Sequence, residues 1–209
     1  MDLKDQRVDY TKFELDDASA GNDPLVLFSK WFELANQQEE EANIMILGTV
    51  YDNKPQNRIV LLKEVLDGEF VFYTNYESKK GKSIDENPNV SLLFFWQQSQ
   101  RQVRIEGVAR KVSAQQSDDY FYSRPIESQI GAIASSQSDE LHDRRDLEQK
   151  VEELRSYYSS NPIKRPEDWG GYTVNPSSFE FWQGRSSRLH DRIVFEASES
   201  NWRRKRLYP

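Results

Sequence analysis

Closely spaced runs of β-branched and aromatic residues fill residues 44–112, and this region most constrains the fold. The runs occupy residues 44–51, 58–65, 69–74, 90–96 and 102–112. Polar turn residues separate them, and Asp67-Gly68 between two runs is typical of a tight β-hairpin. Five strands with such short connections predict an antiparallel sheet that curls toward a barrel.

Helical spacing is found on both sides of this region. Asp23 followed by Pro24 is typical of a helix start, and apolar residues then recur at helical spacing as far as Ala35. Further helices are expected at residues 77–87, 114–123, 125–134 and 139–158. Strands are expected again at residues 171–174, 179–182, 189–195 and 202–207.

The predicted fold class is mainly β with packed helices, an α+β arrangement built on a barrel of about eight strands. With 209 residues, the chain is long enough for one domain with a sizeable core. We expect this domain to span residues 21–209. Residues 1–20 are polar and irregular, and we expect them to form an N-terminal arm that can move.

The composition argues against several classes of protein. The formal net charge is −7, which disfavours general nucleic-acid binding, and the basic residues 203–206 are interpreted as an edge strand. No apolar run approaches the roughly 18 residues of a membrane helix, and the polar N-terminus is unlike a signal peptide. We therefore expect a cytoplasmic protein. With no cysteine and two histidines, disulfides, thiolate chemistry and a metal site are not expected.

Two clusters of cations stand out in the first half of this acidic chain. Arg58 and Lys63 flank an apolar run, and on a flat strand they would point to opposite faces. They can serve one ligand only if the strand bends. Ser78, Lys79 and Lys80 follow a strand and begin a helix, which predicts a phosphate site. The simpler alternatives are surface charges at strand ends and a solvated turn.

A third cationic cluster lies near the C-terminus. Arg188, His190 and Arg192 alternate, so on a strand they would share one face. Three such groups repel one another unless an anion, or an acid such as Asp191, lies among them. An exposed polar strand is the alternative, and a single histidine is more often structural than catalytic.

Eight ordered segments resemble one protein family, the pyridoxamine 5′-phosphate oxidases. The resemblance extends from about Arg7 to the C-terminus. The segments are Arg58-Ile-Val-Leu-Leu-Lys63, Phe72-Tyr-Thr-Asn75, Asn87-Pro-x-Val-Ser-Leu-Leu-Phe94, Arg101-Gln-Val103, Tyr120-Phe-x-Ser-Arg-Pro125, Ser128-Gln-Ile-Gly-Ala132, Phe181-Trp-Gln-Gly184 and Arg188-Leu-His-Asp-Arg192. Their order and similar spacing make the resemblance far more specific than any one segment.

This resemblance implies a homodimer of FMN-binding split β-barrels, whose active sites lie at the dimer interface and use residues of both chains. It implies FMN-dependent oxidation of pyridoxamine 5′-phosphate and pyridoxine 5′-phosphate to pyridoxal 5′-phosphate. Molecular oxygen would be the electron acceptor, and H₂O₂ would be the second product.

The resemblance also implies roles for individual residues. The FMN-binding positions are Arg58, Ile59, Val60, Leu61, Leu62, Lys63, Tyr73, Thr74, Lys79, Lys80, Gln102, Gln137, Ser138, Trp182 and Arg192. The substrate-binding positions are Arg7, Tyr10, Lys63, Tyr120, Arg124, Ser128, Arg188 and His190. Arg188 and His190 are the expected catalytic residues, while Arg7 and Tyr10 would close over the substrate. Lys79 stands where the family often has arginine, so a point charge replaces a bidentate fork.

Two other functions are compatible with the same barrel. One is a protein that binds FMN or pyridoxal 5′-phosphate without turnover, and the other is a flavin reductase. The Arg188–His190 pair and the substrate phosphate set favour the oxidase, because a simple flavin binder has no need of them. Bleaching of the flavin by a nicotinamide cofactor would identify a reductase.

Overall fold

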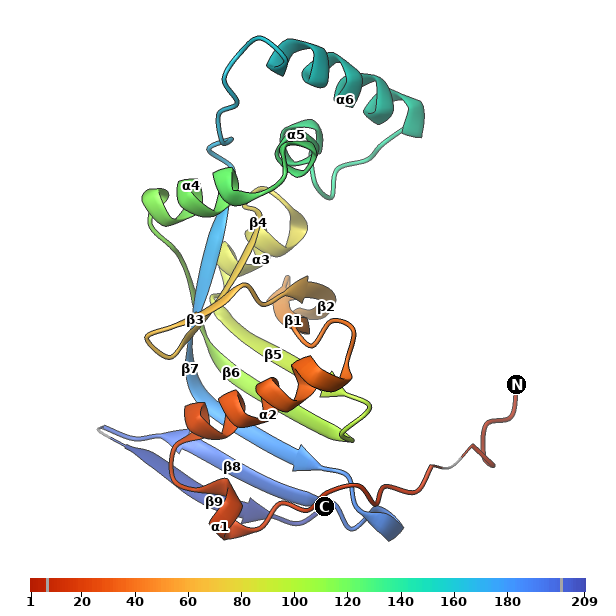
Figure 1. The fold of residues 1–209 in the computed structure, drawn as a ribbon, viewed down its shortest axis with the longest axis vertical. Helices are drawn as coiled ribbons and strands as arrows, with labels where there is room; N and C mark the ends of the chain where they lie inside the picture. Colours follow the sequence, from red (N-terminus) through yellow and green to blue (C-terminus); the bar gives the residue numbers. More distant parts are fainter. Residues whose placement is uncertain (7, 200) are drawn as a thin grey trace.

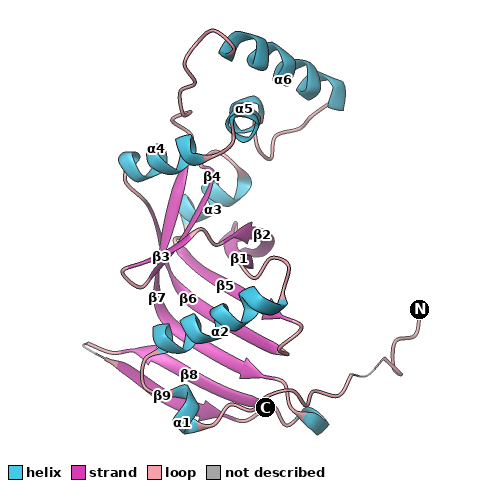
Figure 2. Ribbon diagram, in the orientation of Figure 1, coloured by secondary structure: helices cyan, strands magenta, loops and turns pink. Residues whose placement is uncertain are grey.

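An antiparallel β-sheet forms the centre of the computed structural model, which describes residues 1–6, 8–199 and 201–209 (Figure 2). In these described residues the strands are β1 (Ile44–Tyr51), β2 (Lys54–Leu61), β3 (Glu64–Leu66), β4 (Glu69–Asn75), β5 (Asn89–Trp96), β6 (Arg101–Lys111), β7 (Trp169–Gln183), β8 (Asp191–Ala197) and β9 (Trp202–Leu207). The α-helices are α1 (Asp17–Ala20), α2 (Pro24–Gln38), α3 (Lys79–Glu86), α4 (Ala114–Ser123), α5 (Ile126–Ala134) and α6 (Arg144–Tyr158).

The sheet is open and does not close into a complete barrel. Hydrogen bonds connect the strands in the order β2-β1-β5-β6-β7-β4-β3, and β8 and β9 continue from β7. Among the described residues, β2 and β3 at the two ends of this order do not pair with each other. The mainly β, α+β prediction is confirmed. The described part of the chain has nine strands, where the sequence predicts about eight.

The predicted strand at residues 58–65 is in fact two strands. β2 starts earlier because Asp52 and Asn53 take the left-handed conformation and turn the chain back along β1. At the other end, the Leu62 N–H donates to the residue before β1 at 2.9 Å. The Lys63 N–H instead donates to a β4 carbonyl oxygen at 2.8 Å. The chain therefore changes its partner strand between these two residues.

A single long strand, β7, replaces the two strands predicted at residues 171–174 and 179–182. Proline lacks the N–H that a ladder needs, but Pro176 is tolerated because it lies opposite Gly107, where the register shifts. β7 pairs with β4 through its first part, with β8 through its last part, and with β6 along most of its length. It thus connects the two ends of the molecule (Figure 1).

β8 begins two residues later than the predicted strand at residues 189–195. Before it, Ser186–Arg188 form one turn of 3₁₀ helix, in which Arg188 has a φ of 63°. A left-handed backbone conformation cannot continue an extended strand. The prediction that Arg188, His190 and Arg192 alternate on one strand is therefore wrong, and of the three only Arg192 lies in β8.

The helices follow local signals more closely. Asp23 caps α2, where its carboxylate accepts a backbone N–H at 2.8 Å. Pro125 separates α4 from α5. α6 starts later than predicted, at Arg144, because the side chain of Asp143 caps it. Residues 135–143 are therefore a loop, and this loop contributes to the site described below.

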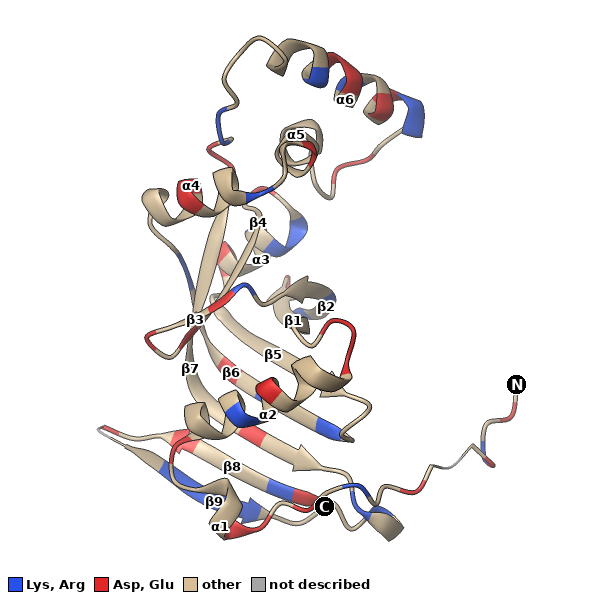
Figure 3. Cartoon of the chain, viewed as in Figure 1, with Lys and Arg blue, Asp and Glu red and all other residues tan. Residues whose placement is uncertain are grey.

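The apolar core lies between the sheet and α2, which crosses the sheet face (Figure 1). The ring of Phe28 in α2 packs edge-on, 5.0 Å from Phe70 and 5.3 Å from Phe94 between centroids. Leu15 and Ala20, each 2% exposed, belong to the same cluster, so the end of the predicted arm packs on the body. α6 stands beyond the sheet and carries many charged residues (Figure 3). No described helix is long and apolar enough to cross a membrane.

Candidate functional site

Lys80, in the first turn of α3, is surrounded by uncharged oxygen atoms. Its Nζ lies 2.6 Å from Oε1 of Gln137 and 3.1 Å from Oγ1 of Thr74. The Thr74 hydroxyl donates to the same Gln137 oxygen at 3.0 Å. Since Gln137 belongs to the loop between α5 and α6, the fold brings this predicted FMN-binding position to two others, Thr74 and Lys80, that are distant from it in sequence.

The turn that leads into α3 is tightly built. The Ser78 hydroxyl accepts from the Gly81 N–H at 3.4 Å and donates to the Asn75 carbonyl oxygen at 2.6 Å. The Asn75 amide donates to the Asp168 carboxylate at 2.8 Å. A Cβ at Gly81 would lie 1.9 Å from the Tyr76 carbonyl oxygen, so this close approach requires glycine.

Arg58 is a second cation close to Lys80. Its Nη1 donates to the Thr49 hydroxyl at 2.8 Å and to the Leu47 carbonyl oxygen at 3.1 Å. Burial, and then the positive charge of Arg58, lower the pKa of Lys80 to about 8, and burial also lowers the pKa of Arg58. Within the described part of the chain, no carboxylate pairs with either cation. Two such neighbouring cations are suited to bind an anion.

A second group of predicted cofactor positions forms a row across three strands. Gln102 of β6 lies opposite Trp182 of β7, which lies opposite Arg192 of β8. Side chains of directly opposed residues in an antiparallel sheet share one face. Nε of Arg192 donates to Glu180 at 2.8 Å, and its Nη1 donates to the Tyr208 carbonyl oxygen at 2.9 Å.

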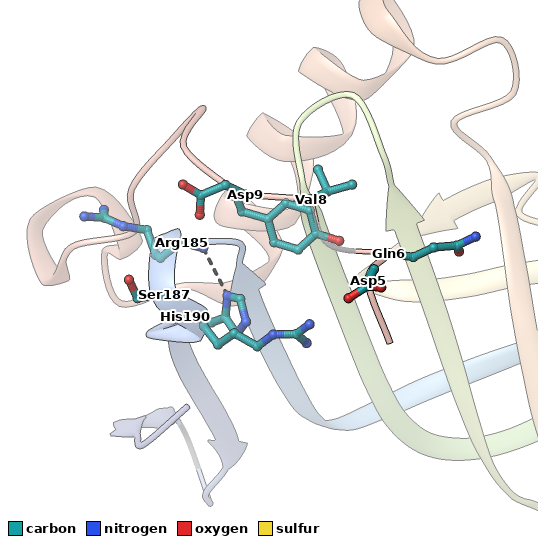
Figure 4. A pocket seen from close by; sticks show the side chains of 9 residues that line it. Asp5, Gln6, Val8, Asp9, Arg185, Ser187 and His190 are labelled. Carbon is teal, nitrogen blue, oxygen red and sulfur yellow. Dashed lines mark hydrogen bonds between the residues drawn. The ribbon is translucent and has the colours of Figure 1, made fainter. Parts of the chain in front are cut away.

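A cavity of about 1100 Å³ lies between the N-terminal arm and the turn before β8 (Figure 4). Its lining residues are Asp5, Gln6, Val8, Asp9, Tyr10, Arg185, Ser187, Arg188 and His190. The ring of Tyr10 is 6.0 Å from His190 and 5.9 Å from Trp182 between centroids. The structure thus brings together three predicted substrate-binding positions, Tyr10, Arg188 and His190.

The hydrogen bonds around His190 identify its tautomer. The Arg185 N–H donates to Nδ1 of His190 at 3.0 Å (Figure 4). The proton of the neutral ring is therefore assigned to Nε2. Burial, and then the charge of Arg188, lower the pKa of His190, while Asp191 acts in the opposite direction. The imidazole is consequently neutral near pH 7.

The predicted residues for the substrate phosphate lie elsewhere. Lys63, Tyr73 and Tyr120 line a cavity of about 420 Å³. The rings of Tyr73 and Tyr120 stack with centroids 3.8 Å apart, and Trp169 extends this stack. The guanidinium of Arg124 lies 4.7 Å from the Trp169 ring centroid. Nη1 of Arg124 is buried and has no hydrogen-bond partner among the described residues.

The remaining predicted positions are less closely tied to these clusters. Ser128 lies in the first turn of α5, where its N–H donates to the Pro125 carbonyl oxygen at 2.9 Å. Lys79 and Ser138 are exposed. Arg7 lies outside the described residues. The apolar predicted positions, which end β2 and form the bend after it, are Ile59, Val60, Leu61 and Leu62.

The clusters lie toward opposite ends of one chain. Figure 1 shows α3, α4 and the adjoining part of β4 in the half of the molecule that ends in α5 and α6, and the turn before β8 at the opposite end. Lys80 and Tyr120 belong to the first end, and His190 and Trp182 to the second. A single copy therefore carries the predicted site residues in two separate clusters, named half-sites from here on.

Sequence reasoning missed several residues that hold these groups in place. Arg185 orients His190 through its backbone, and Asn75 fixes the turn before α3. Arg101 is the most buried of the missed cations, at 9% exposure. The sequence contained a signal for Arg101, because it alternates in step with Val103 and Ile105 and therefore points to the same side of the strand as these core residues.

Two family models match the chain. Residues 33–158 match the model described as pyridoxamine 5′-phosphate oxidase. Residues 169–209 match the pyridoxine 5′-phosphate oxidase C-terminal dimerisation region. A curated protein of Leptospira interrogans, pyridoxine/pyridoxamine 5′-phosphate oxidase, is 52% identical over 210 residues, which cover 99% of this chain and 98% of the relative.

Solved structures share the fold. PhzG from Burkholderia lata 383, in complex with tetrahydrophenazine-1-carboxylic acid, is 28% identical, with a TM-score of 0.86 and coverage of 93% of this chain and 98% of that chain. A pyridoxamine 5′-phosphate oxidase-related, FMN binding protein from Nostoc punctiforme is 14% identical, with a TM-score of 0.72 and coverage of 90% and 100%. With both family models and the 52% identical relative, the chain belongs to the pyridoxamine 5′-phosphate oxidase family of oxidoreductases.

Proposed function

We propose that this protein oxidises pyridoxamine 5′-phosphate and pyridoxine 5′-phosphate to pyridoxal 5′-phosphate, with FMN as cofactor. Molecular oxygen accepts the electrons and yields H₂O₂; with the amine substrate, water supplies the aldehyde oxygen and the nitrogen leaves as ammonia. The observation that carries the proposal is the pair of half-buried cations Arg58 and Lys80, whose described hydrogen-bond partners are all neutral. The relative's name and the 52% identity support the substrate class.

The residues present fit the phosphate of FMN. A dianion would supply the counter-charge that Arg58 and Lys80 lack, and the Thr74 hydroxyl and the first turn of α3 add hydrogen-bond donors. Gln102, Gln137, Ser138, Trp182 and Arg192 would hold the rest of the cofactor together with residues 59–63. When bound, the flavin supplies the redox chemistry that no side chain provides.

The substrate phosphate fits the cluster around Tyr120. Nη1 of Arg124 is buried without a described hydrogen-bond partner, so a phosphate oxygen would satisfy it. Lys63 and Ser128 add a cation and a hydroxyl group. Because the phosphate is remote from the reacting carbon of the substrate, binding it there orients the ring without taking part in the chemistry.

Arg188 and His190 act on the substrate ring. With Nδ1 engaged by the Arg185 N–H, neutral His190 holds its proton at Nε2 and can donate it in a hydrogen bond to the substrate. The guanidinium of Arg188 stabilises negative charge on the substrate. Tyr10, packed against Trp182 and His190, excludes water from this part of the cavity.

A homodimer would unite the two half-sites. Each active site would take the Lys80 and Tyr120 end from one chain and the Trp182 and His190 end from the other. The match to a dimerisation region at residues 169–209 supports this arrangement. The cytoplasmic location stays a prediction.

The test is a turnover measurement on the purified protein. We expect a yellow flavin spectrum and, on addition of pyridoxine 5′-phosphate in air, formation of pyridoxal 5′-phosphate with one H₂O₂ per product. A yellow protein that forms no product would instead be a binding protein. Flavin bleaching by a nicotinamide cofactor, without turnover of either vitamer, would identify a reductase.

A further inference from the structure

A buried guanidinium group, that of Arg101, is not explained by the functions assigned so far. Arg101 is the first residue of β6 and is 9% exposed, on the same side of the strand as Val103 and Ile105. Burial lowers its pKa to about 10, which leaves the group charged at neutral pH. In the described part of the chain no carboxylate forms an ion pair with it. An unpaired buried cation is costly, so other groups must stabilise it.

Two aromatic rings and one amide surround this group. The Cζ atom of Arg101 lies 4.6 Å from the ring centroid of Phe13 and 4.3 Å from that of Trp31. Its Nε donates to Oε1 of Gln183 at 2.8 Å. Trp31 belongs to α2, whereas Phe13 belongs to the N-terminal arm. The cation is thus bound between the core and the arm, and cation–π attraction is strongest when water is excluded.

The turn before β6 also binds the arm, mainly through hydrogen bonds to the backbone of the arm. Oε1 of Gln100 accepts the N–H groups of Thr11 and Lys12 at 3.1 and 3.3 Å. The Lys12 ammonium donates to the Gln98 carbonyl oxygen at 2.5 Å. The amide of Gln183 donates to the Gln100 carbonyl oxygen at 3.2 Å, which ties this turn to Arg101. The arm is therefore held over three consecutive residues.

The residue next to this attachment is Tyr10, which lies in the proposed substrate cavity. Its ring packs against Trp182 and His190. A Cβ at Gly184 would lie 2.6 Å from the Tyr10 ring, so the ring sits directly on the backbone there. The Gly184 N–H donates to the Gln100 carbonyl oxygen at 2.8 Å. The turn at Gln100 thus binds both the arm and the end of β7, on which Tyr10 lies.

We propose that Arg101 is a positioning residue which, through Phe13, clamps the arm so that Tyr10 covers the cavity beside His190. This role rests on the proposed function only in taking that cavity as the substrate site. Arg101 touches neither substrate nor cofactor in this proposal. The clamp acts on the arm, which in turn places Tyr10.

Phe13 provides the cleanest variants, because it lies outside the buried apolar core. Phe13→Leu keeps an apolar side chain but removes the ring face, while Phe13→Tyr keeps the ring. For Phe13→Leu we expect KM for pyridoxine 5′-phosphate to rise by about three- to tenfold, with FMN content unchanged. Trypsin cleavage after Lys12 should accelerate by a similar factor. Phe13→Tyr should behave as wild type in both measurements.

Phe32→Leu is the matched control, since Phe32 is likewise an aromatic residue but its ring packs on Phe28 and Trp96 in the core. It should leave KM and arm cleavage unchanged. Arg101→Met completes a double-mutant cycle: in that background, Phe13→Leu should have no further effect. If Arg101→Met does not fold, the two Phe13 variants and the Phe32→Leu control still test whether the ring of Phe13 clamps the arm.

Arm cleavage separates failure of the clamp from failure of the proposed function, because it needs no turnover. A wild-type protein inactive on both vitamers would contradict the proposed function, yet cleavage would still report on the clamp. Equal cleavage rates for Phe13→Leu and wild type would overturn the clamp. So would a rise in KM of the same size for Phe13→Leu and Phe13→Tyr.

Discussion

At the scale of single residues, the site depends on cations that lack acidic partners. Lys80 and Arg58 are partly buried among hydroxyl, amide and carbonyl oxygen atoms. The sequence identifies both cations, but it does not show that they are neighbours. That proximity, and the position of Gln137, depend on how the loop at residues 135–143 packs against β4, which no local pattern encodes.

We predict that the affinity of the apoprotein for FMN falls as the pH rises above about 8, by at most about tenfold per pH unit. Above its lowered pKa of about 8, Lys80 must take up a proton to attract the phosphate. The effect of Lys80 on the stability of the apoprotein has the opposite pH dependence. Between about pH 8 and its ordinary pKa of 10.5, the unfolded chain binds more protons, so apoprotein stability rises with pH. Fluorescence titration with FMN across this range measures the affinity.

Two variants test this assignment. Lys80→Met should weaken FMN binding and abolish its pH dependence near pH 8. Lys54→Met, at an exposed position on the β1–β2 hairpin, should follow the wild-type curve. An unchanged slope in Lys80→Met would assign the titration to another group.

A second residue-scale prediction separates cofactor from substrate. Arg58→Ala should give largely colourless protein whose activity is restored in part by excess FMN, because one charge-assisted phosphate contact is lost. Such a contact contributes about 1.5–3 kcal/mol, or roughly 10- to 100-fold in affinity. Arg188→Ala should stay yellow but lose kcat/KM by a similar or larger factor. Arg144→Ala, on the exposed surface of α6, is the control. Loss of flavin in Arg188→Ala, with normal turnover after reconstitution, would contradict the assignment of Arg58 to the cofactor and Arg188 to the substrate.

At the scale of elements, local signals predicted helices and hairpins well, while strand limits depended on pairing. Asp23 acts through its side-chain cap, and Asp67-Gly68 acts through its left-handed backbone conformation, so both signals are local and the sequence alone reveals α2 and the β3–β4 hairpin. The division of residues 58–65 follows from a change of partner strand, and the continuity of β7 through Pro176 from a shifted register with β6. Neither can be seen without the neighbouring strand.

We predict that Gly81→Ala weakens FMN binding and lowers the free energy of unfolding by about 1–3 kcal/mol, the usual cost of overpacking. The new methyl group would meet the Tyr76 carbonyl oxygen, which is backbone and cannot rotate away. The first turn of α3 must then move. Denaturant unfolding of the apoprotein and FMN titration measure the two effects.

Gly131→Ala in α5 is the matched control, because a Cβ there meets nothing within 4 Å. It should leave FMN affinity unchanged and stabilise the protein by about 0.4–1 kcal/mol, by restricting the unfolded chain. Equal effects of the two alanines on FMN binding would show that the close approach at Gly81 has no role in holding the cofactor.

At the scale of the whole molecule, β7 carries Trp169 beside Tyr120 at one end and Trp182 beside His190 at the other. The family resemblance supplied the list of site residues. It could not supply the tautomer of His190 or the attachment of the arm at Gln100, since these depend on contacts between distant segments.

We predict that flavin binding requires the homodimer. Dilution until the chains separate should release FMN in parallel with dissociation, since in the proposed arrangement each chain supplies only half of the cofactor site. Light scattering with flavin absorbance detection measures both together. An active, flavin-loaded monomer would contradict the shared site.

The separation of the two half-sites within one chain has a genetic consequence. A chain carrying Arg58→Ala is defective at one end, and a chain carrying Arg188→Ala is defective at the other. In a mixed dimer, both defects fall into one active site, and the second site is built entirely from intact halves. Expressed together, the two defective alleles should therefore support growth that depends on the enzyme better than either allele alone, because about a quarter of all sites are free of both substitutions when the chains pair at random. Two alleles with defects at the same end should not complement each other.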